Sequence, residues 1–154
     1  IKQNKNLRLF LLGSGSLEKQ IFSKIHKYDI KDFIHAPGWI NRNEMNNFLI
    51  SSDIYVSNSY TDGSSVSLLE AMACGLSPIV TKIESIEEWV QHDFNGYIMD
   101  VDKPELMEES ILKLANSSSK LSKFKEQNLI ISKDKLDWNK NFDILQNIYF
   151  NLLK

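Results

Sequence analysis

The sequence predicts an α/β fold in which a mostly parallel sheet is flanked by helices. Short apolar runs of strand length alternate with segments of helical period along the chain, and only helical segments follow residue 100. The length of 154 residues is that of one ordinary domain, and a composition with 42% hydrophobic and 25% charged residues is globular. We therefore expect residues 1–154 to form a single domain.

The first half of the chain contains three of the predicted strands. An apolar LRLFLL run predicts the first strand, and the GSGS turn after it opens an amphipathic helix. A weaker second strand is stopped by Pro37, and a third, DIYVS, follows a helix with apolar residues at helical spacing. The expected elements are strand 7–12, helix 17–25, strand 33–36, a helix around 45–49 and strand 53–57.

The second half continues the alternation and then becomes helical. A polar loop at 59–65 leads into a short helix closed by Gly75, and SPIVT predicts the next strand. A helical stretch separates SPIVT from GYIMD, the last predicted strand, and the serine run 117–119 breaks the helices that follow. The expected elements are helix 66–74, strand 77–81, helix 84–91, strand 96–100, and helices 105–115, 121–131 and 138–153.

Charge and cysteine content exclude several classes of protein. The 18 Lys and Arg against 20 Asp and Glu leave a net charge of -2, so no basic field attracts nucleic acid. The single Cys74 excludes an internal disulfide and a zinc ribbon, which fits a reducing, cytoplasmic setting. No segment approaches the roughly 20 apolar residues of a membrane-spanning helix. Because the chain begins with Ile1 rather than Met, we expect it to be a piece of a longer protein.

A glycine pair lies at the first strand-to-helix turn, where backbone amides can face an anion. Gly13 and Gly15 match the first two glycines of a dinucleotide-binding pattern, but Glu18 stands where the third glycine is needed. A tight turn explains the pair as well as a ligand contact does. The three histidines are scattered over separate predicted elements, so no metal site is expected.

The segment 62–80, DGSSVSLLEAMACGLSPIV, stands out because its helix carries a single charge. Apolar residues occupy nearly every face of that helix, so we expect it to be covered on several sides. An unpaired buried carboxylate is unfavourable, so Glu70 must have a compensating partner or open on a wet cleft. Helical spacing places Val66 and Ser67 on the side of Glu70, and this side chain should point toward the loop 62–65.

The loop 62–65 has the features of an anion site. It follows the carboxyl end of a predicted strand, where open α/β sheets bind ligands, and it lies at the positive end of a helix. Gly63 lets a ligand approach the backbone, and Ser64 or Ser65 is expected to cap the helix. Amides for a phosphate, with a carboxylate one turn deeper for vicinal hydroxyls, suit a nucleotide or nucleotide sugar. A capped helix whose Glu70 pairs with a Lys or Arg accounts for the pattern equally well.

The same stretch resembles the signature of retaining glycosyltransferases of family 4 and their relatives, the group 1 type with two Rossmann-like domains known as the GT-B fold. In the C-terminal domain of that family an acidic residue and a Glu flank seven residues, and small residues, glycine, proline and a strand follow. Asp62 and Glu70 flank seven residues here, and EAMACGLSPIV matches the continuation. Three further stretches resemble the family: Gly38-Trp39-Ile40, Glu88 with Asn95-Gly96-Tyr97, and the closing helix with Tyr149.

The resemblance implies roles for the residues of this segment. Glu70 would bind the hydroxyls of the nucleotide ribose, and Asp62, the one residue assigned to the catalytic centre, would contact the transferred sugar. The amides that would receive the diphosphate or the sugar are those of Gly63, Ser64 and Ser65. The main departure is Asp62, because the family usually has Glu at this position, with a side chain one methylene longer.

Other residues would complete the nucleotide-sugar site. Val66 lies beside the loop, and Gly13 and Gly15 offer further amides. Trp39 would lie against the base, although a core or surface tryptophan explains this residue equally well. The basic pair that neutralises the donor diphosphate in the family lies before the start of this chain, and the arginines present do not match it.

For the whole enzyme the resemblance implies transfer of a hexose-type sugar, with retention, from a UDP- or GDP-linked donor, without a metal or cofactor. The acceptor, a glycan or lipid-linked molecule, would lie on a missing N-terminal domain, so residues 1–154 alone should transfer nothing. Polysaccharide biosynthesis in the cytoplasm, at the inner face of the cell membrane, is the implied setting. The alternatives are a non-catalytic nucleotide-binding domain, another GT-B enzyme such as a sugar-nucleotide epimerase, and a structural helix with an internal salt bridge.

Overall fold

The computed structural model describes residue 4 and residues 6–153. It divides the chain into two compact units, residues 1–51 and residues 52–154. Among the described residues each unit contains one sheet, and all strand pairs are parallel. Parallel sheets flanked by helices confirm the predicted α/β class. That residues 1–154 act as a single domain stays a prediction.

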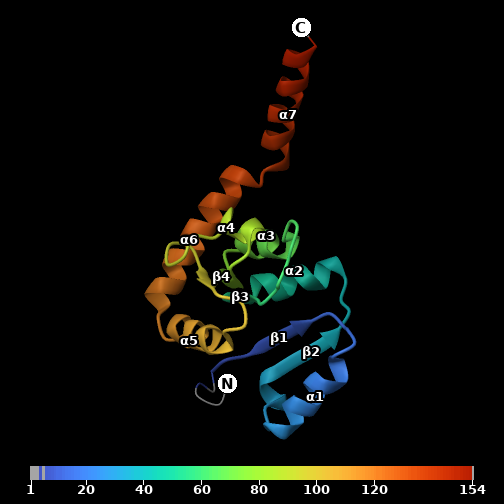
Figure 1. Cartoon of the computed structure of the whole chain (residues 1–154), viewed down its shortest axis with the longest axis vertical. Helices are drawn as coiled ribbons and strands as arrows, with labels where there is room; N and C mark the ends of the chain where they lie inside the picture. The colour runs from blue at the N-terminus through green and yellow to red at the C-terminus, as the bar shows by residue number, and fades with distance from the viewer. Residues whose placement is uncertain (1–3, 5, 154) are drawn as a thin grey trace. The chain divides into compact units, whose positions relative to one another are not determined.

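The first unit is built on a two-stranded parallel sheet (Figure 1). Its two strands pair from Leu9 opposite Ile34 to Leu12 opposite Gly38, and their register shifts by one residue between Phe10 and Leu12. Two α-helices accompany the strands, together with one short 3-10 helix, which was not predicted from the sequence. In chain order the elements are β1 (Leu9–Leu12), α1 (Glu18–Lys27), η1 (Lys31–Phe33), β2 (Ile34–Gly38) and α2 (Arg42–Ile50).

Local side-chain chemistry fixes the start of α2 after β2. The Asn41 side chain accepts a hydrogen bond from the Glu44 backbone N–H at 3.0 Å, and the Glu44 carboxylate accepts one from the Asn41 N–H at 2.9 Å. This reciprocal pair satisfies two donors that a helix start otherwise leaves free. The Phe48 ring then lies 4.9 Å from Phe10 and 5.6 Å from His35, centroid to centroid, which joins α2 to both strands.

The second unit has a three-stranded parallel sheet in the order β3-β4-β5 (Figure 1). Ile54 lies opposite Ser77 at one end of the first strand pair, and Thr81 opposite Met99 at the end of the second. The elements are β3 (Ile54–Ser57), α3 (Val66–Ala73), β4 (Ser77–Thr81), α4 (Glu84–Glu87), β5 (Tyr97–Met99), α5 (Pro104–Ala115), α6 (Ser118–Lys135) and α7 (Trp138–Leu152).

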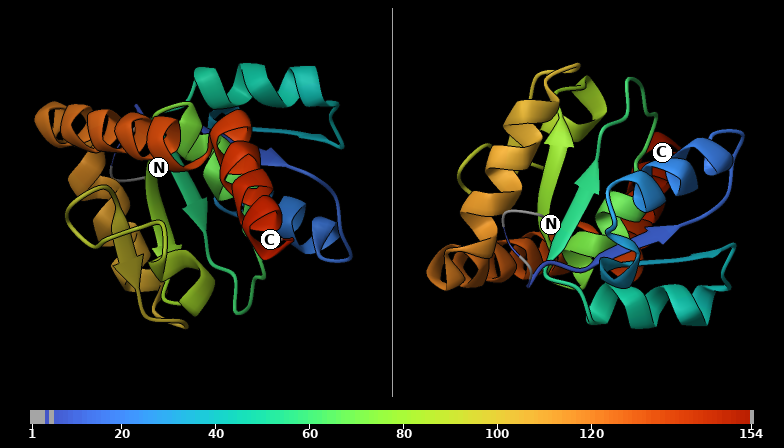
Figure 2. Two further views of the ribbon diagram at one scale, coloured as in Figure 1. Left: turned by 90° about the horizontal axis from the view of Figure 1, so that it is seen from above. Right: turned by 90° about the horizontal axis from the view of Figure 1, so that it is seen from below.

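The central strand β4 is buried along its whole length and feeds two cores through its alternating side chains. Val80 belongs to a cluster with residues of α3 and α4, whereas Ile79 belongs to a cluster with residues of β5, α5 and α6. Helices therefore cover both faces of the sheet, as Figure 2 shows for α5 beside the strands. Phe124 and Ile131 place α6 against both clusters.

Two helices depart most from their predicted bounds, 84–91 and 121–131, which become α4 (Glu84–Glu87) and α6 (Ser118–Lys135). The predicted helix 84–91 ends at Glu87. The Asn95 side-chain oxygen accepts a hydrogen bond from the Gln91 N–H at 2.7 Å, and this bond holds the following residues in a loop. The helix predicted at 121–131 begins earlier, at Ser118, because the Ser117 hydroxyl accepts from the Lys120 N–H. The predicted break is confirmed, because Asn116 and Ser117 separate α5 from α6, but Ser118 and Ser119 already belong to α6.

Two buried asparagines connect α6 to the loop before β5. The Asn95 amide nitrogen donates to the Asn128 side-chain oxygen at 2.9 Å. The Asn128 amide nitrogen donates to the backbone oxygens of Leu76, at 2.8 Å, and of Asn95, at 2.9 Å. Both asparagine side chains are fully buried, and their polar atoms are paired. This network joins the end of α3, the loop before β5 and α6.

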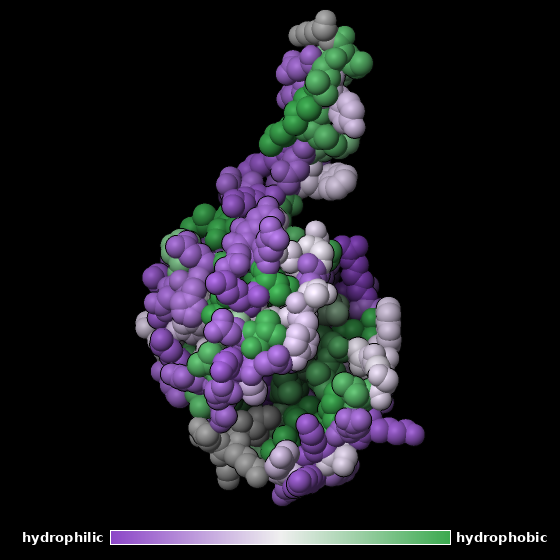
Figure 3. Space-filling model, viewed as in Figure 1, coloured by the Kyte–Doolittle hydropathy of each residue, from purple (hydrophilic) through white to green (hydrophobic). Residues whose placement is uncertain are grey.

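The last helix, α7, is the most exposed element of the second unit. The Asp137 carboxylate caps it by accepting from the Asn139 and Lys140 N–H groups. None of its residues is buried, and Figure 3 shows apolar side chains along it. No helix among the described residues has both the length and the apolarity that crossing a bilayer requires.

Candidate functional site

Helix α3 has a buried face and an open face. Leu68 and Met72 are fully buried, whereas Val66 is 61% exposed. The open residues recur at helical spacing and form one stripe. This stripe consists of Val66, Ser67, Glu70 and Ala73, of which Glu70 is half-buried. The helix is therefore covered less widely than its composition led us to expect, because its small and polar residues share one side.

The Glu70 side chain has no hydrogen bond or ion pair with any residue that the structure describes. Neither the ion pair of Lys82 with Glu87 nor that of Lys120 with Asp93 involves Glu70. Among the described residues, therefore, no Lys or Arg pairs with Glu70, which excludes the structural alternative there. The carboxylate does act on Cys74, one turn away: burial raises the pKa of the Cys74 thiol, and the charge of Glu70 raises it further.

The start of α3 leaves several amides unpaired. Ser65 occupies the N-cap position, but no side chain caps the helix, so the expected cap by Ser64 or Ser65 is wrong. The Val66 N–H donates to the Ser64 oxygen at 2.8 Å. Within the described part of the chain, the N–H groups of Gly63, Ser64 and Ser65 make no hydrogen bond. These groups can bind an anion at the positive end of the helix.

Three side chains from outside the loop 58–65 fasten it to the rest of the second unit. The Thr81 hydroxyl, at the end of β4, donates to the Ser59 carbonyl oxygen. The Ser85 hydroxyl, in the first turn of α4, donates to the Asp62 carbonyl oxygen at 2.9 Å. The third contact is between the Tyr60 hydroxyl and the Asp102 carboxylate, and this contact raises the pKa of Tyr60. None of these three anchors was predicted from the sequence.

A hollow of about 470 Å³ lies beside this loop. Two acidic residues, Asp62 and Glu84, line it from the segments after β3 and β4. Both segments follow the carboxyl ends of parallel strands, which is where open α/β sheets bind their ligands. The lining residues are Tyr60, Thr61, Asp62, Ile83, Glu84 and Ser85.

The remaining predicted contacts lie in the first unit. Gly13 has a φ of +107°, which glycine adopts readily, and its N–H donates to the Gly38 oxygen at 2.8 Å. This bond places Gly13 next to the residue that precedes Trp39. Trp39 is 85% exposed, so it is not a core tryptophan. The Gly15 oxygen accepts from the Glu18 N–H at 3.0 Å, which closes the turn before α1. Base or anion contacts by these residues stay predictions.

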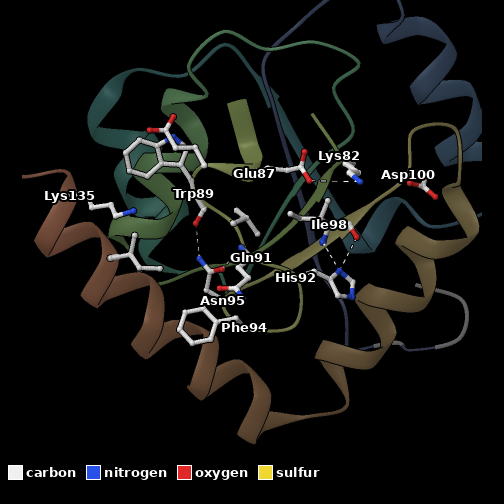
Figure 4. Close-up of a pocket in the computed structure, with 13 residues that line it drawn as sticks. Lys82, Glu87, Trp89, Gln91, His92, Phe94, Asn95, Ile98, Asp100 and Lys135 are labelled. Atoms are coloured by element: carbon white, nitrogen blue, oxygen red, sulfur yellow. Dashed lines mark hydrogen bonds and ion pairs between the residues drawn. The ribbon is translucent and has the colours of Figure 1, made fainter. Parts of the chain in front are cut away.

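A larger hollow, of about 750 Å³, lies around α4 and β5 and contains none of the predicted site residues (Figure 4). On one side of it the Nδ1 atom of His92 lies 3.1 Å from the N–H nitrogen and 3.0 Å from the carbonyl oxygen of Ile98. Lys82 and Glu87, both exposed, approach only to 4.0 Å, so their attraction is weak. Among the described residues, no three His, Cys, Asp or Glu side chains are grouped as metal ligands.

Comparisons with known proteins agree with this fold. Residues 1–130 match the family model described as glycosyl transferases group 1. An uncharacterized glycosyltransferase of Methanocaldococcus jannaschii is 25% identical over 146 residues, which cover 94% of this chain and 37% of that protein. The amylovoran biosynthesis glycosyltransferase AmsK of Erwinia amylovora is 26% identical over 115 residues, which cover 71% of this chain and 28% of that protein.

A solved structure has the same fold. The crystal structure of HepE from Anabaena in complex with UDP-glucose matches with a TM-score of 0.83 at 16% identity, over 95% of this chain and 42% of that chain. This likeness supports the Rossmann-like architecture expected for the C-terminal half of a GT-B protein. The chain spans less than half the length of each of these three relatives.

Proposed function

Because the chain belongs to the group 1 glycosyl transferases, we propose that it binds the nucleotide-sugar donor of a sugar transfer that retains the anomeric configuration. The donor is a UDP- or GDP-linked hexose, and the acceptor is a glycan or a lipid-linked molecule that contacts the part of the protein outside residues 1–154. The setting is polysaccharide biosynthesis in the cytoplasm, at the inner face of the membrane. The name of AmsK and the UDP-glucose bound to HepE support this proposal by analogy.

The observation that carries the proposal is the state of Glu70. A half-buried carboxylate on the open stripe of α3, without a partner among the described residues, is ready to accept hydrogen bonds from two hydroxyl groups. A ribose offers two such hydroxyls on neighbouring carbons. The unpaired amides of Gly63, Ser64 and Ser65 lie at the start of the same helix and suit the diphosphate of the same molecule.

The proposed chemistry needs no nucleophile from this chain. When the bond between sugar and diphosphate breaks, negative charge grows on the leaving diphosphate. Amides fixed at a helix start stabilise such charge without reorganising, which lowers the barrier. Asp62 would contact the transferred sugar beside them. We propose that the reaction uses no metal or cofactor.

The test measures the affinity of the 154-residue chain for UDP-, GDP- and ADP-glucose by isothermal titration calorimetry. We expect one base to be preferred, and Glu70→Gln to weaken binding of that sugar nucleotide about 10- to 100-fold, because hydrogen bonds to a charged group contribute about 1.5–3 kcal/mol. Glu109→Gln is the matched control, since Glu109 is an exposed glutamate on α5. Equal affinity of the wild type and Glu70→Gln would refute the proposal.

A further inference from the structure

We propose that Ser85 is a positioning residue that orients Asp62 and the Gly63 amide for the donor sugar. The inference rests on the proposed function, in which Asp62 contacts the transferred sugar. Ser85 would not touch the substrate. It would act through the single hydrogen bond that its hydroxyl donates to the Asp62 carbonyl oxygen.

This bond crosses between segments rather than serving the helix of Ser85. A serine in the first turn of a helix often satisfies the free amides of its own helix start. In α4 the N-cap residue is Ile83, and no side chain caps that helix. The Ser85 hydroxyl instead reaches a residue 23 positions earlier in the chain, at 2.9 Å. Ser85 itself is half-buried, whereas Asp62 is exposed.

The loop has no other hydrogen bond at this point. Thr81 and Tyr60 fasten its first part, and the Ser64 carbonyl oxygen bonds to the first amide of α3. Between these anchors, and among the described residues, Asp62 makes no hydrogen bond besides the one from Ser85. The orientation of this part of the loop therefore depends on Ser85.

Holding the Asp62 carbonyl also sets the direction of an amide. The carbonyl of Asp62 and the N–H of Gly63 belong to one planar peptide group, and the structure contains no cis peptide bond among the described residues. In a trans peptide the two groups point in opposite directions, so a carbonyl held toward Ser85 turns the Gly63 N–H away from α4. Gly63 has no Cβ and would let this peptide rotate if the bond were absent.

The first test needs no ligand. The chain has six glycines, so a 1H–15N spectrum of protein labelled only at glycine contains few signals. The Gly63 amide nitrogen belongs to the peptide whose carbonyl accepts the hydrogen bond, so its signal reports directly on that bond. We expect Ser85→Ala to shift or broaden the Gly63 signal and to leave those of Gly75 and Gly96 in place. Ser85→Thr, which keeps a hydroxyl, should retain the wild-type position. An unchanged Gly63 signal in Ser85→Ala would overturn the inference.

The second test separates the sugar from the nucleotide. Affinities for UDP-glucose and for UDP, or for the GDP or ADP pair if the chain prefers that base, are measured by calorimetry. Loss of one positioning hydrogen bond should weaken UDP-glucose binding by Ser85→Ala about five-fold and change UDP binding by less than about two-fold. Ser85→Thr should restore the preference for the sugar. A merely structural role of Ser85 would weaken both ligands alike.

The two proposals fail in different ways. If UDP-glucose binding is insensitive to Glu70→Gln, the proposed function fails, while the spectrum still decides whether Ser85 holds the loop. If binding requires Glu70 but Ser85→Ala keeps the wild-type ratio of the two affinities, only the positioning role is wrong. Thermal unfolding of Ser85→Ala close to that of the wild type shows that the variant is folded.

Discussion

Replacing Asn128 with Ala removes the centre of the buried network between α6 and the loop before β5. The Asn128 side chain makes three hydrogen bonds of 2.8 to 2.9 Å, two as donor and one as acceptor. Each contributes about 1 kcal/mol net, and the substitution removes one buried partner from Leu76 and two from Asn95, whose amide nitrogen keeps only its bond to the Trp89 oxygen. We therefore expect the free energy of unfolding to fall by about 3 kcal/mol. For a chain of this length that loss lowers the melting temperature by roughly 6–12 °C.

The assay is thermal unfolding followed by far-ultraviolet circular dichroism. Asn147→Ala is the matched control, because it makes the same change at an exposed position of α7 and should alter stability by less than about 0.5 kcal/mol. Combining Asn128→Ala with Asn95→Ala should be less damaging than the sum of the single changes, because the bond between the two side chains is lost only once. A stable Asn128→Ala variant, or strict additivity, would refute the assignment of a shared network.

Two further predictions concern close packing and pH. A methyl group added at Gly96 would lie 2.6, 2.7 and 2.8 Å from three atoms, one of them a backbone oxygen, whereas one added at Gly63 meets no atom within 4 Å. Gly96→Ala should therefore lower the free energy of unfolding by about 1–3 kcal/mol and Gly63→Ala by much less, as urea unfolding can show. The hydrogen bond from Lys120 is the main cause that lowers the pKa of Asp93. Because that pKa is depressed in the folded state, the stability advantage of the wild type over Asp93→Asn should be full at neutral pH and shrink as pH falls below about 4. The control is Glu87→Gln, which breaks an ion pair of 4.0 Å and should change the free energy of unfolding little at neutral pH. If Asp93→Asn remained as much less stable than the wild type in acid as at neutral pH, the reasoning would be contradicted.

The strands and the longer helices could be predicted because their signals are local. The SPIVT run becomes β4, Ser77–Thr81, as expected, since continuous apolar residues fit a strand buried on both faces. Helix α3 starts at Val66, where the polar loop ends. The early end of α4 could not be predicted, because it depends on the Asn95 side chain, which approaches from farther along the chain.

The positions of Asp62, Glu70 and their loop in the fold could be predicted from the sequence, but the contacts around them could not, and their binding of a ligand stays a prediction. The spacing of Asp62 and Glu70 and the position of their loop after β3 indicated where to look. That Glu70 lacks a partner among the described residues depends on where every lysine and arginine lies, which no local pattern records. Ser64 and Ser65 suggested a cap by residue type, yet no side chain caps α3. The bond from Ser85 joins residues 23 positions apart and has no signature in the sequence.

His92 has a consequence for how copies of this protein behave at high concentration. Among the described strands, β5 has a neighbour on one side only, and an open strand edge invites a strand of another molecule to add to it. The His92 Nδ1 atom faces both polar backbone atoms of Ile98. In one tautomer Nδ1 accepts from the Ile98 N–H, and in the other it donates to the Ile98 oxygen. A strand of another molecule would have to displace this ring before it could pair with β5, so the histidine hinders self-association at this edge of the sheet.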